Sequence, residues 1–319
     1  MIAVVIPYFQ RAPGVLRKAL ASVAAQHGCP LPVRVIVVDD ASPAPPAPEI
    51  DAAALPAGML RLIARANGGP GAARNTGLDQ VPDAARYVAF LDSDDEWSSD
   101  HLARAAVALD AGHDFYFANH LQLGQQVGAF ARAGRIAPAE HPPLGAAPGL
   151  HAYRGDMLDQ IIRGNVVGTS TVVYRRAGFE RLRFLPEFAN AGEDYLFWMS
   201  LAHAGARIAF SSRVEATYGK GVNVYAGAGW GTEQHLLRVH NELKFKRRIG
   251  RAFPVTVAQR AHIDAGIRDL RVAFARDLLH RLAHGRRLPL GLLTTHLLMD
   301  PLSYLQLPAV AVGLAKQRS

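Results

Sequence analysis

Residues 87–95 read Tyr-Val-Ala-Phe-Leu-Asp-Ser-Asp-Asp, an unbroken apolar run that ends in three acids among four residues. The run Tyr87–Leu91 is typical of a strand that is buried on both faces of a sheet. Acids directly after such a strand destabilise the folded state unless a cation pairs with them. The stretch therefore predicts an interior strand that delivers the carboxylates of Asp92, Asp94 and Asp95 to a site at its carboxyl end.

Short apolar runs alternate with segments of helical periodicity through the first 120 residues. Strands are predicted at Ile2–Ile6, Val33–Val38, Leu60–Ile63, Tyr87–Leu91 and, more weakly, Phe115–Phe117. Helices are predicted at residues 15–23, 71–79 and 100–110, the last with Ser98 or Ser99 as its N-cap. This alternation predicts an α/β fold with a mostly parallel sheet. Because ligands of such sheets bind at the carboxyl ends of the strands, four polar loops are expected to converge on one crevice: 7–11, 39–42, 67–74 and 92–95.

The acidic loops offer two kinds of ligand contact. Asp92 and Asp94, one residue apart, can bind one Mg²⁺ or Mn²⁺ whose other oxygen ligands come from a diphosphate. Asp39, after the second strand, can accept a hydrogen bond from a base N–H or a ribose hydroxyl. Capping and turn formation are the structural alternatives for both loops, with Asp39 and Asp40 as a capping pair in the second.

Two further segments combine the start of a helix with charged side chains. In residues 67–75, Asn-Gly-Gly-Pro-Gly-Ala-Ala-Arg-Asn, backbone amides can approach a phosphate and Arg74 supplies a guanidinium. The segment lacks the Gly-x-Gly-x-x-Gly spacing and Pro70 removes an amide, so a dinucleotide site is not supported. Glu193 and Asp194 stand where a helix begins, where an acid can act as a general base or simply complement the helix dipole.

Five motifs, in this order and spacing, resemble those of family 2 glycosyltransferases. They are Val5–Phe9, Val37–Ser42, Asn67–Asn75, Phe90–Asp95 and Gly192–Asp194, and the likeness covers about residues 1–215. Asn165, Thr169–Thr171 and Arg175 also look like that family's segment before the last motif. The resemblance implies the GT-A fold, a Rossmann-like α/β fold with a mostly parallel central sheet flanked by helices. It also implies inverting transfer of a sugar from a nucleotide diphosphate, usually a uridine one, to an acceptor hydroxyl, in the setting of bacterial surface or exopolysaccharide synthesis.

Carried over position by position, the resemblance implies a role for each motif residue. Those expected to bind the nucleotide sugar are Pro7, Tyr8, Arg11, Asp39, Arg74, Asp92 and Ser93. Among them, Asp39 would hold the uracil. Asp94 and Asp92 would hold the Mg²⁺ or Mn²⁺, which neutralises charge on the leaving diphosphate. Asp194, or its neighbour Glu193, would deprotonate the hydroxyl of the acceptor, which is expected to be a lipid-linked saccharide.

The middle of the chain is less regular in pattern. The predicted loops are residues 124–148, rich in Gly, Ala and Pro, and residues 215–233, expected to be a mobile loop over the site. Helices are predicted at residues 156–163 and 194–204, and strands at residues 170–174 and 207–210. The predicted organisation is a catalytic domain over residues 1–233, with halves 1–120 and 121–233, followed by a helical region over residues 234–319.

The formal net charge of +8 is concentrated in one segment. Residues 234–289 contain 13 Lys and Arg against 4 Asp and Glu, and an apolar stripe from Ile263 to Leu282 runs beside the arginines at helical spacing. A basic segment suits anionic lipid head groups, a polyanionic substrate or nucleic acid, or is a solvated helix face. We expect residues 234–319 to rest on the inner face of the cytoplasmic membrane, with packing on the catalytic domain or dimer formation as alternatives. No nucleic-acid partner is expected.

Composition excludes several classes of protein. With 50% hydrophobic and 19% charged residues the chain is too apolar to be disordered, and its single cysteine, Cys29, forms no intramolecular disulfide. No apolar run has the roughly 18–20 residues of a spanning helix, and the N-terminus lacks the basic start of a signal peptide. A cytoplasmic enzyme is expected. The alternatives are a nucleotide- or polyanion-binding protein of the same fold without turnover, and a nucleotidyltransferase, which would need more basic residues after the first strand than Arg11.

Overall fold

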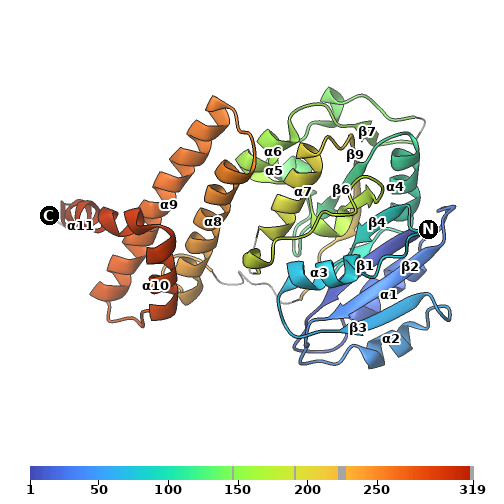
Figure 1. Cartoon of the computed structure of the whole chain (residues 1–319), viewed down its shortest axis with the longest axis horizontal. Coiled ribbons are helices and arrows are strands. Elements are labelled where there is room, and N and C mark those ends of the chain that lie inside the picture. Colours follow the sequence, from blue (N-terminus) through green and yellow to red (C-terminus); the bar gives the residue numbers. More distant parts are fainter. Residues whose placement is uncertain (146, 190–191, 222–227, 317–319) are drawn as a thin grey trace. The chain divides into compact units, whose positions relative to one another are not determined.

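The computed structural model describes residues 1–145, 147–189, 192–221 and 228–316, which divide between two compact units (Figure 1). One unit comprises residues 1–189 and 193–222, and the other comprises residues 190–192 and 223–319. The predicted boundaries after residue 120, between the two halves of the catalytic domain, and after residue 233, at its end, stay predictions.

A nine-stranded sheet forms the centre of the first unit, in the order β3-β2-β1-β4-β8-β6-β9-β5, with β7 paired to β9. The strands are β1 (Ile2–Tyr8), β2 (Val33–Asp39), β3 (Leu60–Ala64), β4 (Tyr87–Phe90), β5 (Glu96–Trp97), β6 (Phe115–Leu121), β7 (Leu150–Ala152), β8 (Val173–Arg175) and β9 (Ile208–Thr217). From β3 to β4 neighbouring strands are parallel, whereas β8 is antiparallel to both β4 and β6. The sheet is thus parallel in its N-terminal portion and mixed beyond β4.

The parallel strands end together at one edge of the sheet. β1 pairs with β2 up to Tyr8 and Asp39, and with β4 up to Val5 and Phe90. Every side chain of β1 and β4 is buried, as interior strands require. The polar residues that follow these strands therefore leave the sheet at the same edge, which confirms the predicted convergence of the loops.

The helices of the first unit include those predicted from the sequence, at nearly the predicted residues. They are α1 (Leu16–Ala24), α2 (Ala47–Ala53), α3 (Pro70–Leu78), α4 (His101–Asp110), α5 (Ala129–Ala133), α6 (Met157–Gly164) and α7 (Glu193–His203), with the 3-10 turns η1 (Pro138–Glu140), η2 (Thr169–Thr171) and η3 (Pro186–Phe188). Gly77 lets α3 lie directly on β1, because a Cβ there would stand 2.4 Å from Cγ1 of Val5. This close approach fixes the helix that carries Arg74 against the centre of the sheet.

Two local predictions in the first unit are wrong. Asp100, whose side chain makes no capping bond to the helix, is the N-cap of α4 in place of Ser98 or Ser99. The Ser98 hydroxyl donates to the Asp100 carboxylate instead, so it is not available to the helix amides. The segment 124–148 contains α5 and η1 rather than a plain loop.

Two other predicted elements differ in extent. Residues 170–174 form the end of η2 and the start of β8, because the Thr171 hydroxyl and amide both close a turn onto the Gly168 carbonyl. β9 extends through the first residues of the predicted loop 215–233. Residues 222–227 of that loop lie outside the described residues.

The second unit is helical, as predicted for the C-terminal region. Its elements are α8 (Glu233–Ala252), α9 (Val257–Ala283), α10 (Leu290–Met299), the 3-10 segment η4 (Pro301–Gln306) and α11 (Leu307–Lys316). α8 and α9 lie side by side and share a small apolar core of Leu236, Val239, Phe274 and Leu278 (Figure 1). No helix among the described residues has both the length and the hydropathy that crossing a bilayer requires.

The predicted apolar stripe of α9 is buried only in part. Phe274 and Leu278 are core residues, whereas Leu282 is 55% exposed. The arginines beside the stripe are not uniformly solvated either, since Arg281 is 1% exposed and bonds to Asp277. Tertiary packing against α8 therefore overrides the simple division of α9 into an apolar and a solvated face.

Candidate active site

Asp95 anchors the acidic turn that follows β4. Its carboxylate accepts hydrogen bonds from the hydroxyl of Ser170 (2.5 Å) and from the amide of Gly219 (3.0 Å). The Ser170 hydroxyl in turn accepts one from the amide of Asp92 (3.0 Å), so it ties both ends of the turn together. Burial, and then the neighbouring acids, raise the pKa of Asp95 to about 8. The partners of Asp95 in these bonds are uncharged, so they do not neutralise its carboxylate.

Asp94 lies between the acidic turn and the segment after β9. Its carboxylate accepts a hydrogen bond from the amide of Gly221 (2.6 Å). A Cβ at Gly219 would stand 1.7 Å from the Asp94 carbonyl oxygen, so only glycine allows the two segments to approach this closely. Burial, and then the charge of Asp92, raise the pKa of Asp94.

Arg74 of α3 is the cation that joins the acidic turn to α7. Its guanidinium donates from Nη2 to Asp92 (2.6 Å) and from Nη1 to Glu193 (3.0 Å), and its side chain is only 4% exposed. Burial acts to lower the pKa of Arg74, but Asp92 and Glu193 outweigh this effect and raise it. The guanidinium also lies over the ring of Phe184, 5.4 Å from the ring centre. One buried cation thus holds two carboxylates that are far apart in the sequence.

The two acids at the start of α7 occupy different environments. Glu193 is 6% exposed, and burial followed by the charge of Asp194 raises its pKa to about 7 against the opposing effect of Arg74. Asp194 is partly exposed, and its carboxylate accepts hydrogen bonds from the Thr169 hydroxyl (2.9 Å) and the Tyr195 amide (2.8 Å). Burial raises the pKa of Asp194 as well. The positive end of the helix dipole stabilises both carboxylates in their ionised form.

Aromatic rings anchor the helix that carries these acids. Phe197 of α7 stacks on Phe184, with 4.3 Å between ring centres, and Trp198 packs 5.8 Å from Phe90 of β4. Phe90 stands just before the acidic turn in the chain, so one aromatic cluster fixes both acidic segments.

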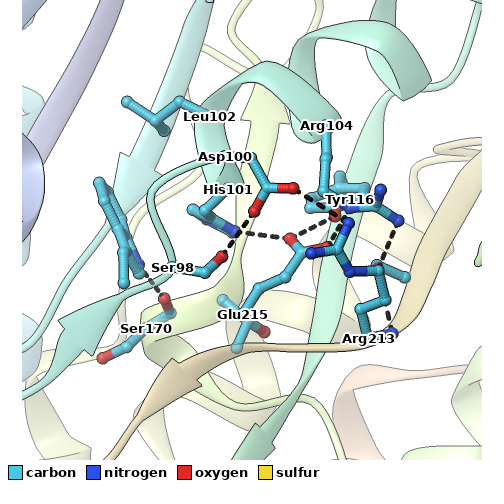
Figure 2. A network of polar contacts seen from close by, with 12 residues as sticks. Ser98, Asp100, His101, Leu102, Arg104, Tyr116, Ser170, Arg213 and Glu215 are labelled. Carbon is cyan, nitrogen blue, oxygen red and sulfur yellow. Dashed lines mark hydrogen bonds and ion pairs between the residues drawn. The ribbon is translucent and has the colours of Figure 1, made fainter. Parts of the chain in front are cut away.

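A buried polar network, shown in Figure 2, fixes β9 beside the site. At its centre is Glu215, whose side chain is fully buried. Its partners are Arg104 (2.6 Å), Tyr116 (2.6 Å) and His101 (2.9 Å). Burial acts to raise the pKa of Glu215, but the hydrogen bond and charge of His101 and the other bonds outweigh it and lower the pKa. Because β9 leads directly to Gly219, this network positions the segment that binds Asp94 and Asp95.

Gln10 joins the loops that follow β1, β2 and β4. Its backbone amide donates to the Ser42 hydroxyl (2.7 Å), and its side-chain amide donates to the Ser93 hydroxyl (3.1 Å). Asp39 is partly exposed and accepts a hydrogen bond at Oδ1 from the Ser42 amide (2.8 Å). Arg11, in the same loop as Gln10, is exposed. The structure therefore gathers these three loops and presents Asp39 and Arg11 toward solvent.

Four residues predicted to contact a nucleotide have buried side chains: Pro7, Tyr8, Ser93 and Arg74. The Tyr8 hydroxyl donates to Glu49 (3.2 Å), and burial together with the Glu49 carboxylate raises the pKa of Tyr8 to about 12. Ser93 is 3% exposed and is occupied by Gln10. The side chains of Tyr8 and Ser93 support the loops from within, and the contacts of these residues with a nucleotide stay predictions.

Asp40 closes the glycine-rich loop that precedes α3. Its carboxylate accepts hydrogen bonds from the amides of Gly68 (3.0 Å) and Gly69 (2.7 Å) and pairs with Arg65. The prediction that these amides approach a phosphate is therefore wrong, because a carboxylate of the chain already binds them. Of the two adjacent acids, Asp40 has the structural role and Asp39 keeps its exposed position.

The acidic turn fits a divalent cation that takes further ligands from a bound molecule. In the part of the chain that the structure describes, no group of three or more His, Cys, Asp or Glu side chains is arranged to hold a metal ion by itself. Asp92, Asp94 and Asp95 nevertheless form one acidic cluster, in which burial, followed by the charge of the neighbouring acids, raises the pKa of Asp94 and Asp95. A hard cation held by Asp92 and Asp94 would relieve such repulsion, and oxygens of a diphosphate could supply its further ligands.

The part of the chain that carries Arg74 and the acidic turn matches a known sequence family. The model of the family described as "Glycosyl transferase family 2" matches residues 3–182, more than half of the chain. The chain belongs to glycosyl transferase family 2. The glycosyltransferase is 37% identical over 229 residues to the succinoglycan biosynthesis protein ExoW of Rhizobium meliloti (strain 1021), which is 70% of each chain. The predicted family and the enzyme class are both confirmed.

Solved structures share the fold of this glycosyltransferase. S. aureus TarS gives a TM-score of 0.55 at 20% identity, covering 88% of this chain, which spans only 43% of TarS. Its fragment TarS 1-349 in complex with UDP-GlcNAc gives 0.54 at 20% identity, covering 86% and 82%. The mannosyltransferase PcManGT from Pyrobaculum calidifontis, in complex with GDP-Man and Mn²⁺, gives 0.56 at 18% identity, covering 97% and 84%. These neighbours confirm the predicted GT-A fold.

Sequence patterns do not identify several residues that hold the site together. Ser170 lies in a segment predicted as a strand, yet its side chain secures the acidic turn. Gln10 and Glu215 belong to no motif, and Gly219 resembles any other glycine of a loop. An acid on the inward face of a strand, such as Glu215, signals a polar network only once the register of that strand is known.

Asp95→Asn tests the charge accumulated at this turn. A carboxyl whose pKa is raised from 3.8 to about 8 keeps its proton longer in the folded than in the unfolded chain, so its contribution to stability falls as pH rises through that window. The free energy of unfolding of Asp95→Asn, relative to the parent, is therefore expected to increase steadily between about pH 4 and pH 8. Urea unfolding of both proteins in the presence of a chelator measures this difference in the free energy of unfolding.

Comparing variant with parent at each pH cancels the other titrating groups of the chain. Histidines whose pKa is lowered by burial, such as His120 and His296, act in the opposite sense in both proteins. Asp51→Asn, an exposed acid of α2, is the control and should show no such trend. A difference for Asp95→Asn that is flat with pH would contradict the prediction.

Proposed function

We propose that this glycosyltransferase moves a sugar from a nucleotide diphosphate sugar, a uridine one, to an acceptor hydroxyl with inversion of configuration. The observation that carries the proposal is the bridge by which Arg74 joins Asp92 of the acidic turn to Glu193 of α7. It holds a carboxylate cluster suited to a metal and a diphosphate near the acids that can act as a base. A single displacement needs one base and one stabilised leaving group, and both are provided.

For the donor, we assign the exposed residues of the converging loops. Asp39, with one carboxylate oxygen bonded to Ser42, is proposed to accept from the uracil, and exposed Arg11 to border the nucleotide. Asp92 and Asp94 would hold Mg²⁺ or Mn²⁺, which when bound neutralises charge on the leaving diphosphate. The complexes of TarS 1-349 with UDP-GlcNAc and of PcManGT with GDP-Man and Mn²⁺ support a nucleotide-sugar donor and a divalent cation.

We assign proton abstraction to Asp194. Its carboxylate is partly exposed and bonded to Thr169, whereas the Glu193 carboxylate is buried and accepts a hydrogen bond from the Arg74 guanidinium. A raised pKa brings Asp194 closer to the operating pH, which favours a general base. Glu193 is then a positioning residue that acts through Arg74.

The acceptor is proposed to be a lipid-linked saccharide in bacterial surface or exopolysaccharide synthesis. The name of ExoW, a succinoglycan biosynthesis protein, supports this setting. We propose residues 1–233 as the catalytic domain and residues 234–319 as a region that rests on the inner face of the cytoplasmic membrane. In the second unit, Leu290 (70% exposed), Leu298 (82%) and Leu305 (69%) offer apolar side chains for that contact.

Cosedimentation with vesicles measures the membrane contact. Protein incubated at low salt with phosphatidylglycerol vesicles is expected to pellet, and a Leu298→Ser/Leu305→Ser variant to pellet less, because both lose apolar area that would enter the interface. Vesicles of phosphatidylcholine alone are the control for charge. Folded protein that stays in the supernatant with anionic vesicles would exclude the membrane proposal.

Calorimetric titration with UDP, GDP and dTDP tests the donor assignment. We expect UDP to bind in the presence of Mn²⁺, with weaker binding of the other two nucleotides and of UDP with chelator. Asp94→Asn, which removes one carboxylate charge from the acidic turn, is expected to weaken binding about tenfold or more with Mn²⁺ and to change it little with chelator. Asp51→Asn serves as the matched control. Binding that is equal with and without metal would contradict the role of Asp94.

A further inference from the structure

The second unit contains a cavity whose walls are almost entirely basic. It has a volume of about 410 Å³ and lies between residues of α8 and α9. Six cations and one acid line it, together with Ile267: Lys246, Arg247, Arg251, Arg260, Arg268, Arg271 and Asp264. Ligand sites in proteins have about 300–1,000 Å³, so the cavity has the size of a site for a small ligand.

Helical periodicity places these charges on facing sides of the two helices. On α9 the lining residues begin at Arg260 and recur after four, three, one and three residues, which is one face of a helix. On α8 they occupy the last two turns before the helix ends at Ala252. Since the two helices are joined by residues 253–256 and pack side by side, both basic faces meet in one place (Figure 1).

Each helix carries a glycine where a cation of the other helix crosses it. A Cβ at Gly250 of α8 would stand 2.2 Å from Nη1 of Arg260, whose Nη2 donates to the Gly250 carbonyl (2.5 Å). A Cβ at Gly266 of α9 would stand 2.8 Å from Cε of Lys246. The backbone is therefore shaped to bring both cations together, and their proximity is built into the helix pair.

Only part of this positive charge is compensated within the unit. Arg247 and Arg271 bond to Asp300, whose side chain is fully buried (2.5 Å and 2.8 Å). Arg251 and Arg268 are exposed residues of the cavity wall. Clustered like charges destabilise a folded protein, and a polyanion bound among them removes that repulsion. A compact ligand with several negative charges would therefore reduce the repulsion among these cations most.

We propose that this cavity, the C-terminal basic pocket, is a binding site for a diphosphate group. Arginine guanidinium groups bind phosphate oxygens through paired hydrogen bonds, and four or more cations around one cavity suit the charge of a diphosphate better than that of a single carboxylate. The group is either a soluble diphosphate or the diphosphate head of a membrane lipid. The proposal concerns the second unit alone and does not rest on the proposed sugar transfer.

Titration of the full chain with inorganic pyrophosphate tests the site. A chelator is present throughout, so that no metal can hold pyrophosphate at the acidic turn of the first unit. We expect binding that weakens about tenfold for each pocket arginine removed, hence about a hundredfold in Arg251→Ala/Arg268→Ala. Both side chains are exposed, so the fold of this variant is expected to persist, and its thermal unfolding checks this. Asp264→Asn, which removes the only acid of the lining, is expected to bind severalfold more tightly.

Arg276→Ala is the matched control, because Arg276 is an exposed arginine of α9 that does not line the cavity. It should bind pyrophosphate as the parent does. Absence of pyrophosphate binding at low ionic strength, or equal loss in Arg276→Ala and in the pocket variant, would overturn the proposal. Titration with UDP and Mn²⁺ is a separate measurement, so failure here and failure of the proposed function are distinguishable.

Vesicles distinguish the two sources of the diphosphate. Phosphatidylcholine vesicles doped with a polyprenyl diphosphate are expected to capture the parent more than Arg251→Ala/Arg268→Ala if the ligand is a lipid head group. If only free pyrophosphate binds, the site takes a soluble diphosphate. One outcome is that phosphatidylglycerol vesicles capture the parent and the pocket variant equally and that pyrophosphate does not bind. This outcome would indicate a diffuse basic surface instead of a defined site, and it would overturn the proposal.

Discussion

Asp194→Asn is expected to lower the rate of sugar transfer by about 10²–10⁴-fold, the usual contribution of a general base. An amide cannot accept the proton of the acceptor hydroxyl, but its oxygen can still accept the hydrogen bond of Thr169, so the start of α7 should stay in place. The proposed nucleotide site lies at the loops after the strands, so UDP with Mn²⁺ is expected to bind as tightly as before. Transfer is measured as UDP release from the donor sugar in the presence of lipid-linked acceptor, and binding by calorimetry.

Glu193→Gln is the matched comparison for this experiment. Gln keeps an oxygen that accepts from Arg74 but loses the charge, so we expect a smaller loss of transfer and a change in nucleotide affinity through the shift of Arg74. Both variants replace a carboxylate by an amide, at neighbouring positions of the chain. Full transfer in Asp194→Asn together with loss in Glu193→Gln would reverse the assignment of the base.

Arg74→Met is expected to destabilise the folded protein by about 3–5 kcal/mol, which is typical when one partner of a buried ion pair is removed. Met replaces most of the apolar volume of the side chain but leaves Asp92 and Glu193 without their shared cation. Their charges then repel each other and the neighbouring acids in a poorly solvated place. Urea unfolding at pH 8, above the pKa of about 7 of Glu193 in the parent, measures the loss.

Arg86→Met controls for the removal of any ion-paired arginine. Its bridge to Asp110 is on the surface, with side chains 51% and 41% exposed, so we expect a change of at most about 1 kcal/mol. A second comparison is Arg74→Met/Glu193→Gln, which should recover part of the lost stability because it removes one of the unpaired charges. If Arg74→Met costs no more than Arg86→Met, the buried bridge does not hold the site together.

The parallel strands and the loops after them could be predicted because their information is local. An apolar run bounded by proline, as in Ile2–Ile6, or by acids, as in Tyr87–Leu91, defines an interior strand without reference to the rest of the chain. The spacing of such runs with helices between them then requires parallel pairing, and parallel pairing brings the strand ends together. The start of a helix at Glu193 and Asp194 could likewise be predicted, because acids are favoured at a helix N-terminus.

Adjacent residues of the same type could not be told apart by pattern. Asp39 and Asp40 are identical in chemistry, yet Asp40 turns inward to bind the amides of Gly68 and Gly69 while Asp39 is partly exposed. Tyr8 likewise belongs to a motif associated with a nucleotide, but its hydroxyl finds Glu49 in the folded chain. Which of two similar side chains forms the hydrogen bond to a buried group depends on distances that exist only in the folded chain.

The sequence by itself determined the family, the strands whose ends converge and the candidate acids of the site, because each of these depends on neighbours in the chain. The tertiary structure alone decided which carboxylates are bonded, that Ser170 and Glu215 hold the acidic turn and β9, and that the basic faces of α8 and α9 enclose one pocket. The physical reason is that a buried polar group must find its hydrogen-bond partner or counter-charge wherever the chain brings one within about 3 Å, and that partner is generally far away in the sequence.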